Sequence, residues 1–254
     1  MDLNFKEFGD GDPVIILHGL FGTSDNWQTL AKQLATDYTV FIVDQRNHGR
    51  SPHAPEFNYE LMAEDLNYFM QDKWIDEARI VGHSMGGKTA MQFALNFPEK
   101  ITQLVVVDIG VQQYVGGHET VFDALLSLDL TAVQSRKDAD EKLGQTIQEY
   151  GIRQFLLKNL TRTKDGQYKW KMNLPVIHEN YQAILAAITS DRTFEGPTHF
   201  IKGEKSDYLN LSEVEPIKGL FPNATFEEIK RAGHWVHAEA PKETLASLQT
   251  FFDQ

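Results

Sequence analysis

The sequence predicts an α/β fold, a mostly parallel, doubly wound sheet with a helical segment inserted into it. Short runs rich in Val and Ile lack the alternation of half-exposed strands, which is typical of strands buried on both faces. These runs alternate with longer stretches in which apolar residues recur at helical spacing. Such an order indicates parallel strands joined by crossover helices.

The elements of the core follow from these patterns in chain order. We expect strands at residues 14–17, 40–43, 78–81 and 104–107, with helices between them at 27–34, 59–70 and 85–95. The alternation returns late in the chain, with strands at 198–201 and 225–229 and helices at 214–220 and 241–252. Pro241 suits the first turn of the last helix, where its missing N–H costs no hydrogen bond.

The alternation stops between residues 112 and 190. Helical patterns cover residues 121–128, 139–150, 155–160 and 181–188, and a hairpin-like stretch at 163–168 contains the tight-turn pair Asp165-Gly166. We therefore predict a core of residues 1–111 and 191–254 and a helical lid of residues 112–190. The lid should lie over the carboxyl ends of the strands, where α/β sheets bind ligands.

The composition narrows the classes of function. The 254-residue chain has no cysteine, which excludes disulfides, thiolate metal sites and cysteine nucleophiles. Its formal charge of -12 disfavours nucleic acid or an anionic membrane as a partner, since both attract clustered Lys and Arg. Because the chain has no long apolar segment and no signal-peptide pattern, we expect a cytoplasmic location.

The stretch Gly82-His83-Ser84-Met85-Gly86 lies between a predicted strand and a predicted helix. A serine between two glycines at such a turn is typical of a nucleophile elbow, because only residues without a side chain fit so close to the raised hydroxyl. The alternative is a glycine-rich turn of the kind found in many parallel sheets. The rest of the chain favours the nucleophile, since it supplies candidates for the other groups that Ser84 needs.

A nucleophilic serine needs a base and an orienting acid. His234 follows the last predicted strand and is the best candidate base, with a loop histidine bound to backbone as the alternative and His237 as a packing residue. Asp108 and Asp207 each follow a predicted strand and both remain candidate acids. We favour Asp108, because the buried strand before it fixes its position at the carboxyl edge. In the pattern Gly-x-x-Asp after the strand at 198–201, the acid position counted from Gly203 holds Ser206, and Asp207 comes one residue later. Glu204 is a weaker third choice.

An oxyanion hole should lie beside the nucleophile. We expect its donors to be the backbone N–H groups of Met85 and of Leu20, which lies in the loop of residues 18–22 after the first predicted core strand. His18 in that loop is expected to be structural. We further expect Phe21, His83 and Trp235 to contact the substrate.

A charged loop of residues 44–51 also ends a predicted strand, and we expect Asp44 and Arg46 to brace the floor of the site. No His, Asp or Glu grouping has metal-ligand spacing, and no Walker or Gly-x-Gly-x-x-Gly motif is present. The sequence therefore predicts no metal site and no cofactor.

Taken with these residues, the chain resembles the α/β-hydrolase superfamily from end to end, through the motifs at residues 18–22, 82–87 and 233–237. Within it, the chain is most similar to the small bacterial YbfF-type esterases, whose Asp-x-Arg-Asn-His-Gly-x-Ser stretch is matched at residues 44–51. The acid of that family follows the sixth strand, which implies Asp108. The chain departs from the family by carrying Asp207 after the next strand as well.

These residues predict a serine carboxylesterase acting on small acyl esters through an acyl-enzyme. A thioesterase, a carbon–carbon bond hydrolase or a perhydrolase would use the same triad, and a non-catalytic small-molecule receptor is the alternative of another class. Epoxide hydrolases and haloalkane dehalogenases carry aspartate at the nucleophile position, so Ser84 argues against both. The expected partner is a small-molecule acyl ester, bound by a monomer or a small homo-oligomer.

Overall fold

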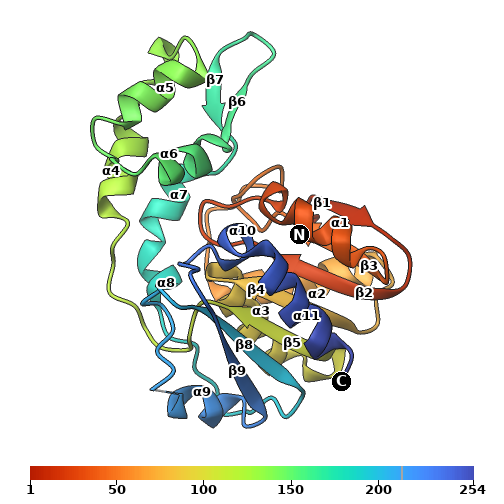
Figure 1. Cartoon of the computed structure of the whole chain (residues 1–254). Helices are drawn as coiled ribbons and strands as arrows, with labels where there is room; N and C mark the ends of the chain where they lie inside the picture. Colours follow the sequence, from red (N-terminus) through yellow and green to blue (C-terminus); the bar gives the residue numbers. More distant parts are fainter. Residues whose placement is uncertain (213) are drawn as a thin grey trace.

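A seven-stranded sheet forms the centre of the protein, whose computed structural model describes residues 1–212 and 214–254. The strand order is β1-β3-β2-β4-β5-β8-β9 (Figure 1). Only β1 pairs antiparallel, with β3; the other pairings within this sheet are parallel. The strands are β1 (Phe5–Phe8), β2 (Asp12–Leu17), β3 (Tyr38–Val43), β4 (Ala78–His83), β5 (Ile101–Val107), β8 (Thr198–Gly203) and β9 (Ala224–Ile229).

The register of the strands brings their carboxyl ends to one edge. Leu17 at the end of β2 pairs with Gly82 in β4, and His83 at the end of β4 pairs with Val107 at the end of β5. Val107 pairs in turn with Ile201 in β8. The loops that follow β2, β4, β5 and β8 therefore meet at this edge, as expected for an α/β sheet.

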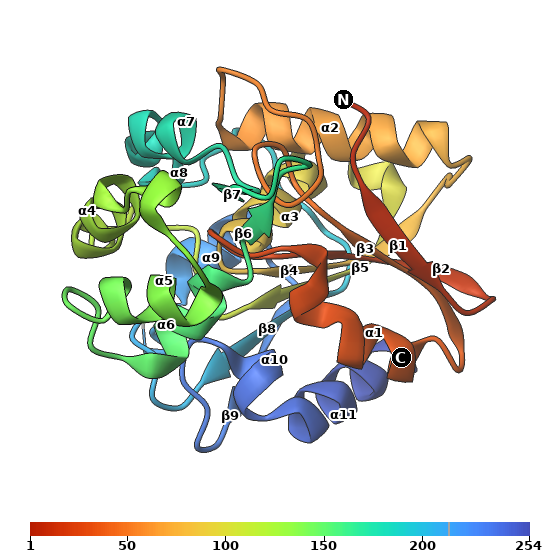
Figure 2. The same ribbon diagram turned by 90° about the horizontal axis from the view of Figure 1, so that it is seen from above.

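Helices cover both faces of the sheet, as the predicted doubly wound fold requires (Figure 2). The long helices α2 (Tyr59–Asp72) and α3 (Met85–Asn96) pack together on one face. The helices α1 (Gln28–Leu34) and α11 (Pro241–Phe252) pack together on the other. Shorter elements connect them: η1 (Ser24–Trp27), η2 (Pro98–Lys100), α9 (Glu215–Leu220) and α10 (Val236–Glu239).

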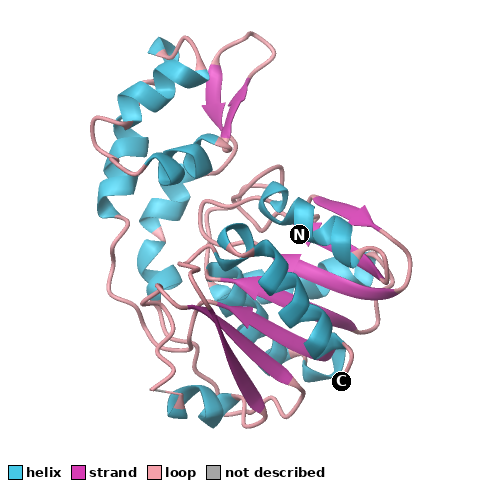
Figure 3. Ribbon diagram, viewed as in Figure 1, coloured by secondary structure: helices cyan, strands magenta, loops and turns pink. Residues whose placement is uncertain are grey.

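The chain between β5 and β8 stands above the carboxyl edge of the sheet (Figure 1). It is mainly helical and carries one short two-stranded hairpin, as Figure 3 shows. We call residues 112–190 the insertion. Its elements are α4 (Glu119–Ser127), η3 (Leu130–Ala132), α5 (Arg136–Leu143), α6 (Tyr150–Leu157), β6 (Leu160–Arg162), β7 (Tyr168–Trp170), α7 (Leu174–Glu179) and α8 (Tyr181–Leu185).

The predicted helix boundaries in the insertion are partly wrong. The helix expected at 139–150 ends at Leu143, because Gly144 caps it and a new helix begins at Tyr150. The helix expected at 155–160 is the end of that second helix, α6, since the chain enters strand β6 at Leu160. The helix expected at 181–188 ends at Leu185, where the chain turns back toward the core.

The two ends of the insertion lie side by side. The Ile188 N–H donates to the Val111 carbonyl over 2.8 Å, and the Tyr114 N–H donates to the Leu185 carbonyl over 2.9 Å. The insertion thus leaves and rejoins the core at one place. Within the described ranges, no helix combines the length and the apolar character needed to cross a bilayer.

Candidate active site

Ser84 stands at a sharp turn between β4 and α3. Its backbone has φ 52° and ψ -119°, a left-handed conformation that is strained for a residue with a Cβ. A Cβ on Gly82 would lie 2.2 Å from the Gly86 carbonyl oxygen, and a Cβ on Gly86 would lie 2.4 Å from the Leu17 carbonyl oxygen. Glycine is therefore required at both positions for the chain to turn so tightly beside β2.

His234 and Asp108 come from different loops and meet at the carboxyl edge. The His234 Nδ1 lies 2.7 Å from Asp108 Oδ2. Because an ionised carboxylate only accepts, Nδ1 donates its proton in this bond, which leaves Nε2 of the neutral ring as an acceptor. Of the two aspartates that the sequence leaves open, Asp108 is the one in contact with His234.

The Asp108 carboxylate is fully buried and held by further donors. Its Oδ1 accepts the Gly203 N–H over 2.9 Å, and its Oδ2 also accepts the Ser206 hydroxyl. Its backbone has φ 54°, a second strained conformation at this edge. These bonds offset the cost of burying the carboxylate and fix its direction.

The other two candidate acids lie elsewhere. Asp207 is exposed, and none of the described residues forms a hydrogen bond or ion pair with its carboxylate. Glu204 is exposed as well, accepts the Arg231 N–H over 2.7 Å and pairs with Lys230. Displacement by one residue along the loop puts Ser206 on the Asp108 carboxylate and turns Asp207 to the solvent.

Uncharged histidines surround His234. His83 donates Nε2–H to the His234 carbonyl over 2.8 Å, and burial lowers the pKa of His83 well below its usual value. His237 stacks on Trp27 with ring centres 4.2 Å apart, and burial lowers the pKa of His237 to about 3. Both rings are thus neutral near pH 7, which leaves Asp108 as the charged neighbour that bonds His234.

The loop of residues 18–22 is held by its own hydrogen bonds. His18 contacts the Gly19 carbonyl through Nδ1 over 2.8 Å, and its Nε2 accepts the Gln45 N–H over 3.0 Å. The Phe21 N–H donates to His48, and the Gly22 N–H donates to Gly19. The Leu20 and Met85 N–H groups, by contrast, donate to no acceptor among the described residues.

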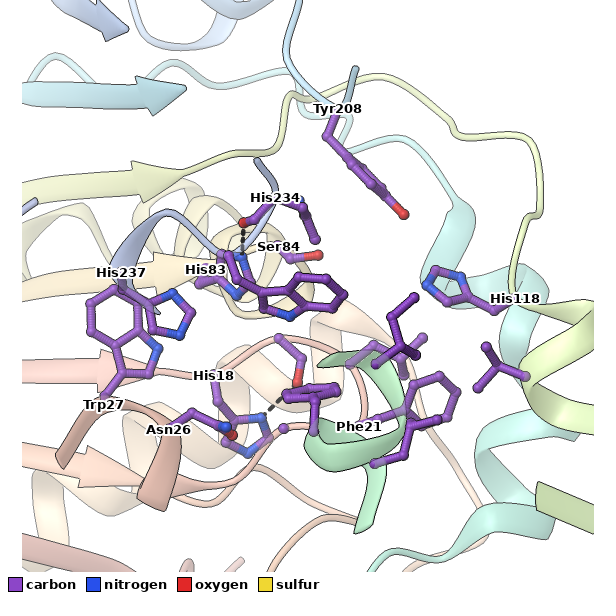
Figure 4. Close-up of a pocket in the computed structure, with 18 of the residues that line it drawn as sticks. His18, Phe21, Asn26, Trp27, His83, Ser84, His118, Tyr208, His234 and His237 are labelled. Carbon is purple, nitrogen blue, oxygen red and sulfur yellow. Dashed lines mark hydrogen bonds between the residues drawn. The ribbon is translucent and has the colours of Figure 1, made fainter. Parts of the chain in front are cut away.

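Two chambers open beside Ser84. The larger has a volume of about 250 Å³ and is bordered by His234, Phe21 and His83 (Figure 4). Trp235, the third predicted substrate-contact residue, borders it as well. The smaller has a volume of about 50 Å³ and is bordered by Met85. Both share four wall residues: Leu20, Ser84, His118 and Tyr208.

Several residues of the site were missed by the sequence analysis. The Tyr208 ring stacks on the His234 ring with centres 4.0 Å apart, and His118 Nδ1 lies 2.6 Å from the Tyr181 hydroxyl of the insertion. Neither position carries a pattern, because Tyr208 lies in a loop and His118 directly before α4. Lys88 did carry a signal, an ionisable side chain one helical turn after Ser84 in an apolar segment.

Lys88 connects the core to both ends of the insertion. Its side chain is fully buried, and its ammonium donates to the Gln112 carbonyl over 2.8 Å and to the Ala186 carbonyl. It also lies 4.8 Å from the centre of the Tyr114 ring. Burial lowers the pKa of Lys88 to about 7, because the low dielectric surroundings disfavour its charge.

Asp44 and Arg46 occupy the bracing positions expected for them. Asp44 is buried and accepts the Ser24 N–H over 2.6 Å and the Arg50 N–H over 2.9 Å. Arg46 pairs with buried Asp65 of α2. Within residues 1–212 and 214–254, no group of three or more His, Asp and Glu side chains could hold a metal ion.

The family model of the alpha/beta hydrolase fold matches residues 12–241. The chain belongs to the α/β-hydrolase family. This α/β hydrolase is 36% identical over 245 residues to the esterase YbfF of Escherichia coli strain K12, covering 96% of this chain and 94% of that protein.

Two further comparisons extend along nearly the whole α/β hydrolase. It is 38% identical over 255 residues to the sn-1-specific diacylglycerol lipase ABHD11 of Danio rerio, covering 97% of this chain and 80% of that protein. A solved structure described as a marine microorganism esterase matches with a TM-score of 0.96 and 42% identity, covering 98% of both chains. These three proteins, to which the α/β hydrolase is similar, are named as two esterases and a lipase.

Proposed function

We propose that the chain is a serine carboxylesterase, with Ser84 as nucleophile, His234 as base and Asp108 as acid. The observation that carries the proposal is the 2.7 Å contact between His234 Nδ1 and buried Asp108, at the chamber where Ser84 also lies. The names of the relatives, which are esterases and a lipase, support an ester as the substrate.

The reaction follows from these positions. His234 Nε2 removes the Ser84 proton as Oγ attacks the ester carbonyl, and the Leu20 and Met85 N–H groups donate to the oxyanion. His234 then protonates the departing alkoxide, which leaves an acyl group on Ser84. His234 then takes a proton from water as the water oxygen attacks the acyl carbonyl, and it returns that proton to the Ser84 oxygen as the bond to the acyl group breaks and the carboxylic acid leaves. Asp108 keeps the imidazole in the required tautomer and stabilises its charged form.

The insertion covers this chemistry in the proposal. Phe21, next to Leu20, offers its carbonyl to the side chain of Asn159 over 2.6 Å, so the insertion also bonds the loop that carries one oxyanion donor. Residues 112–190 act as the lid, which limits water and shapes the substrate site.

The test combines covalent labelling with hydrolysis. A fluorophosphonate should label the folded wild type and hydrolysis of p-nitrophenyl butanoate should be measurable, because both need an activated serine. Ser84→Ala should lose both signals, whereas the control Ser127→Ala, at an exposed serine on α4, should keep both. Wild-type protein that is folded but neither labelled nor active would refute the esterase and favour a ligand receptor on the same fold.

A further inference from the structure

The two chambers at Ser84 differ in size and in the groups that border them. One water molecule, which is about the size of one non-hydrogen atom, needs about 10–15 Å³ of such a chamber. The smaller chamber therefore holds about four non-hydrogen atoms and the larger about twenty. Each therefore fits a different half of an ester. The question is which half enters which chamber.

His234 decides the direction. It borders the larger chamber and is not among the described residues around the smaller one. Because the proton that His234 takes from Ser84 must pass to the leaving oxygen, the alcohol half has to lie on the His234 side. The acyl half then points away from His234.

Met85 marks the opposite side. Helix α3 follows Ser84, and its residues Met85 and Lys88 border the smaller chamber. Leu20 borders both chambers. An ester carbonyl oxygen directed at the Leu20 and Met85 N–H groups places its acyl carbon chain at the mouth of the smaller chamber.

The walls of the smaller chamber are held by buried and partly buried hydrogen bonds. The Tyr59 hydroxyl donates to the Ile184 carbonyl over 2.6 Å, and the Tyr114 hydroxyl accepts the Gly110 N–H over 2.8 Å. The Lys88 ammonium ties the same wall to the Gln112 carbonyl. Such walls resist expansion, because moving them breaks several hydrogen bonds, of which the bond of Tyr59 is fully buried.

The larger chamber has an apolar lining. Its walls include Phe155 and Trp235, whose ring centres lie 5.6 Å apart, and Ile152 of α6. A wide, mainly apolar space suits a large hydrophobic alcohol better than a small polar one.

We infer that the smaller chamber is the acyl site and the larger chamber is the alcohol site, so that the preferred substrates are short-chain acyl esters of bulky apolar alcohols. The inference rests on the proposed esterase function and specifies its substrate class. Acyl groups of up to about five carbons fit, since the carbonyl carbon lies at Ser84 and about four atoms fit beyond it.

Three isoleucines of the insertion allow a matched test. Ile184 borders the smaller chamber, Ile152 borders the larger, and buried Ile177 borders neither. Each is changed to alanine, and kcat/KM is measured on two series. One series is p-nitrophenyl esters from ethanoyl to dodecanoyl; the other is butanoate esters of alcohols from methanol to dodecanol, followed by acid release.

The wild type should prefer short acyl groups and long alcohols. Ile184→Ala should raise kcat/KM for octanoyl relative to butanoyl by about tenfold or more and leave the alcohol preference unchanged. The change removes three carbon atoms from the wall, and the space of one methylene in an apolar pocket is already worth about tenfold. Ile152→Ala should lower the preference for long alcohols and leave the acyl preference unchanged. Ile177→Ala should alter neither preference.

Two outcomes would overturn the assignment. One is a wild type that prefers dodecanoyl esters; the other is an exchange of effects, with Ile184→Ala acting on the alcohol series and Ile152→Ala on the acyl series. If Ile184→Ala does not fold, Ile184→Val makes the same comparison with a smaller change in volume. Failure of the esterase proposal itself is distinct, since the wild type would then hydrolyse no ester in either series.

Discussion

The carboxylate of Asp108 is buried in the candidate site and held there by several hydrogen bonds. It accepts hydrogen bonds from Gly203, Ser206 and His234, and it has no exposure to solvent. An amide in its place would direct an NH₂ group at one of these donors. Replacement of Asp108 by asparagine therefore tests the proposed acid with almost no change in side-chain volume.

Asp108→Asn should lower kcat by about 10⁴-fold, because the amide favours the tautomer of His234 in which Nε2 holds the proton and cannot act as a base. The measurement is kcat on p-nitrophenyl butanoate, with circular dichroism to show that the variant is folded. The control is Asp207→Asn at the exposed aspartate, which should leave kcat unchanged. A large loss in Asp207→Asn with little loss in Asp108→Asn would contradict the assignment.

At the scale of elements, the site depends on how closely β4 and α3 approach β2. The turn at Ser84 brings Gly86 of α3 against the carbonyl oxygens of Leu17 and His18 at the end of β2. The same approach places Ser84 beside the loop that begins at His18. The close contact of these three elements thus sets the distance between Ser84 and Leu20.

Gly86→Ala should lower the free energy of unfolding by about 1–3 kcal/mol, since the added Cβ would overlap backbone that has no free space to move. It should also lower kcat/KM, because the displaced loop carries Leu20. Urea unfolding and ester hydrolysis measure the two effects. Gly219→Ala in α9 is the control, since a Cβ there meets nothing within 4 Å and no stability should be lost. Equal stability of both variants would show that β2 can move away from α3.

The elements that were predicted correctly are those whose signal is local. The unbroken apolar runs of β2, β3 and β5 reflect burial on both faces, so the sequence pattern and the structure agree there. Strand β1 has two charged residues between its two Phe residues, none of its residues is buried, and it lies at the sheet edge, which is why it was missed. The helix ends of the insertion depend on caps and on contacts between helices, which periodicity does not report.

The candidate site divides in the same way. Ser84 and His234 stand in motifs whose residue types are fixed by the turn or the loop, so both could be predicted as members of the candidate site. The choice between Asp108 and Asp207 depended on side-chain direction, which a one-residue offset decides. Tyr208 could not be found from the sequence, because its stacking on His234 arises from the path of a loop far from it in the chain.

At the scale of the whole molecule, Lys88 joins the core to the insertion. Its ammonium reaches carbonyls at both ends of the insertion, and no ion pair to a described carboxylate balances its charge. Burial lowers the pKa of Lys88 to about 7, against an ordinary value of 10.5 for lysine. Between these values the unfolded chain binds more protons than the folded chain, so the free energy of unfolding rises with pH in this window.

The wild type should therefore gain about 2 kcal/mol of stability relative to Lys88→Met between about pH 7 and about pH 9, as the burial cost of the charge disappears. Below about pH 6 the difference between the two proteins should be constant, because Lys88 is then protonated in both states. Urea unfolding at a series of pH values measures this. The control is Lys164→Met at an exposed turn, whose stability relative to the wild type should not change with pH. If the stability difference between the wild type and Lys88→Met is also constant with pH, Lys88 stays charged in the folded protein.

Residues 111–114 are hydrogen-bonded to residues 185–188, so the two ends of the insertion are fixed to each other. Because the insertion leaves and rejoins the core through two adjacent segments, replacing it alters the core surface at one place only. Every strand of the seven-stranded sheet stays where it is. A different insertion can be joined to the same core at this place, since residues of any type at its two ends still offer backbone carbonyls to Lys88. In the proposed esterase, substrate preference can thus change with the insertion while Ser84, His234 and Asp108 stay in the core.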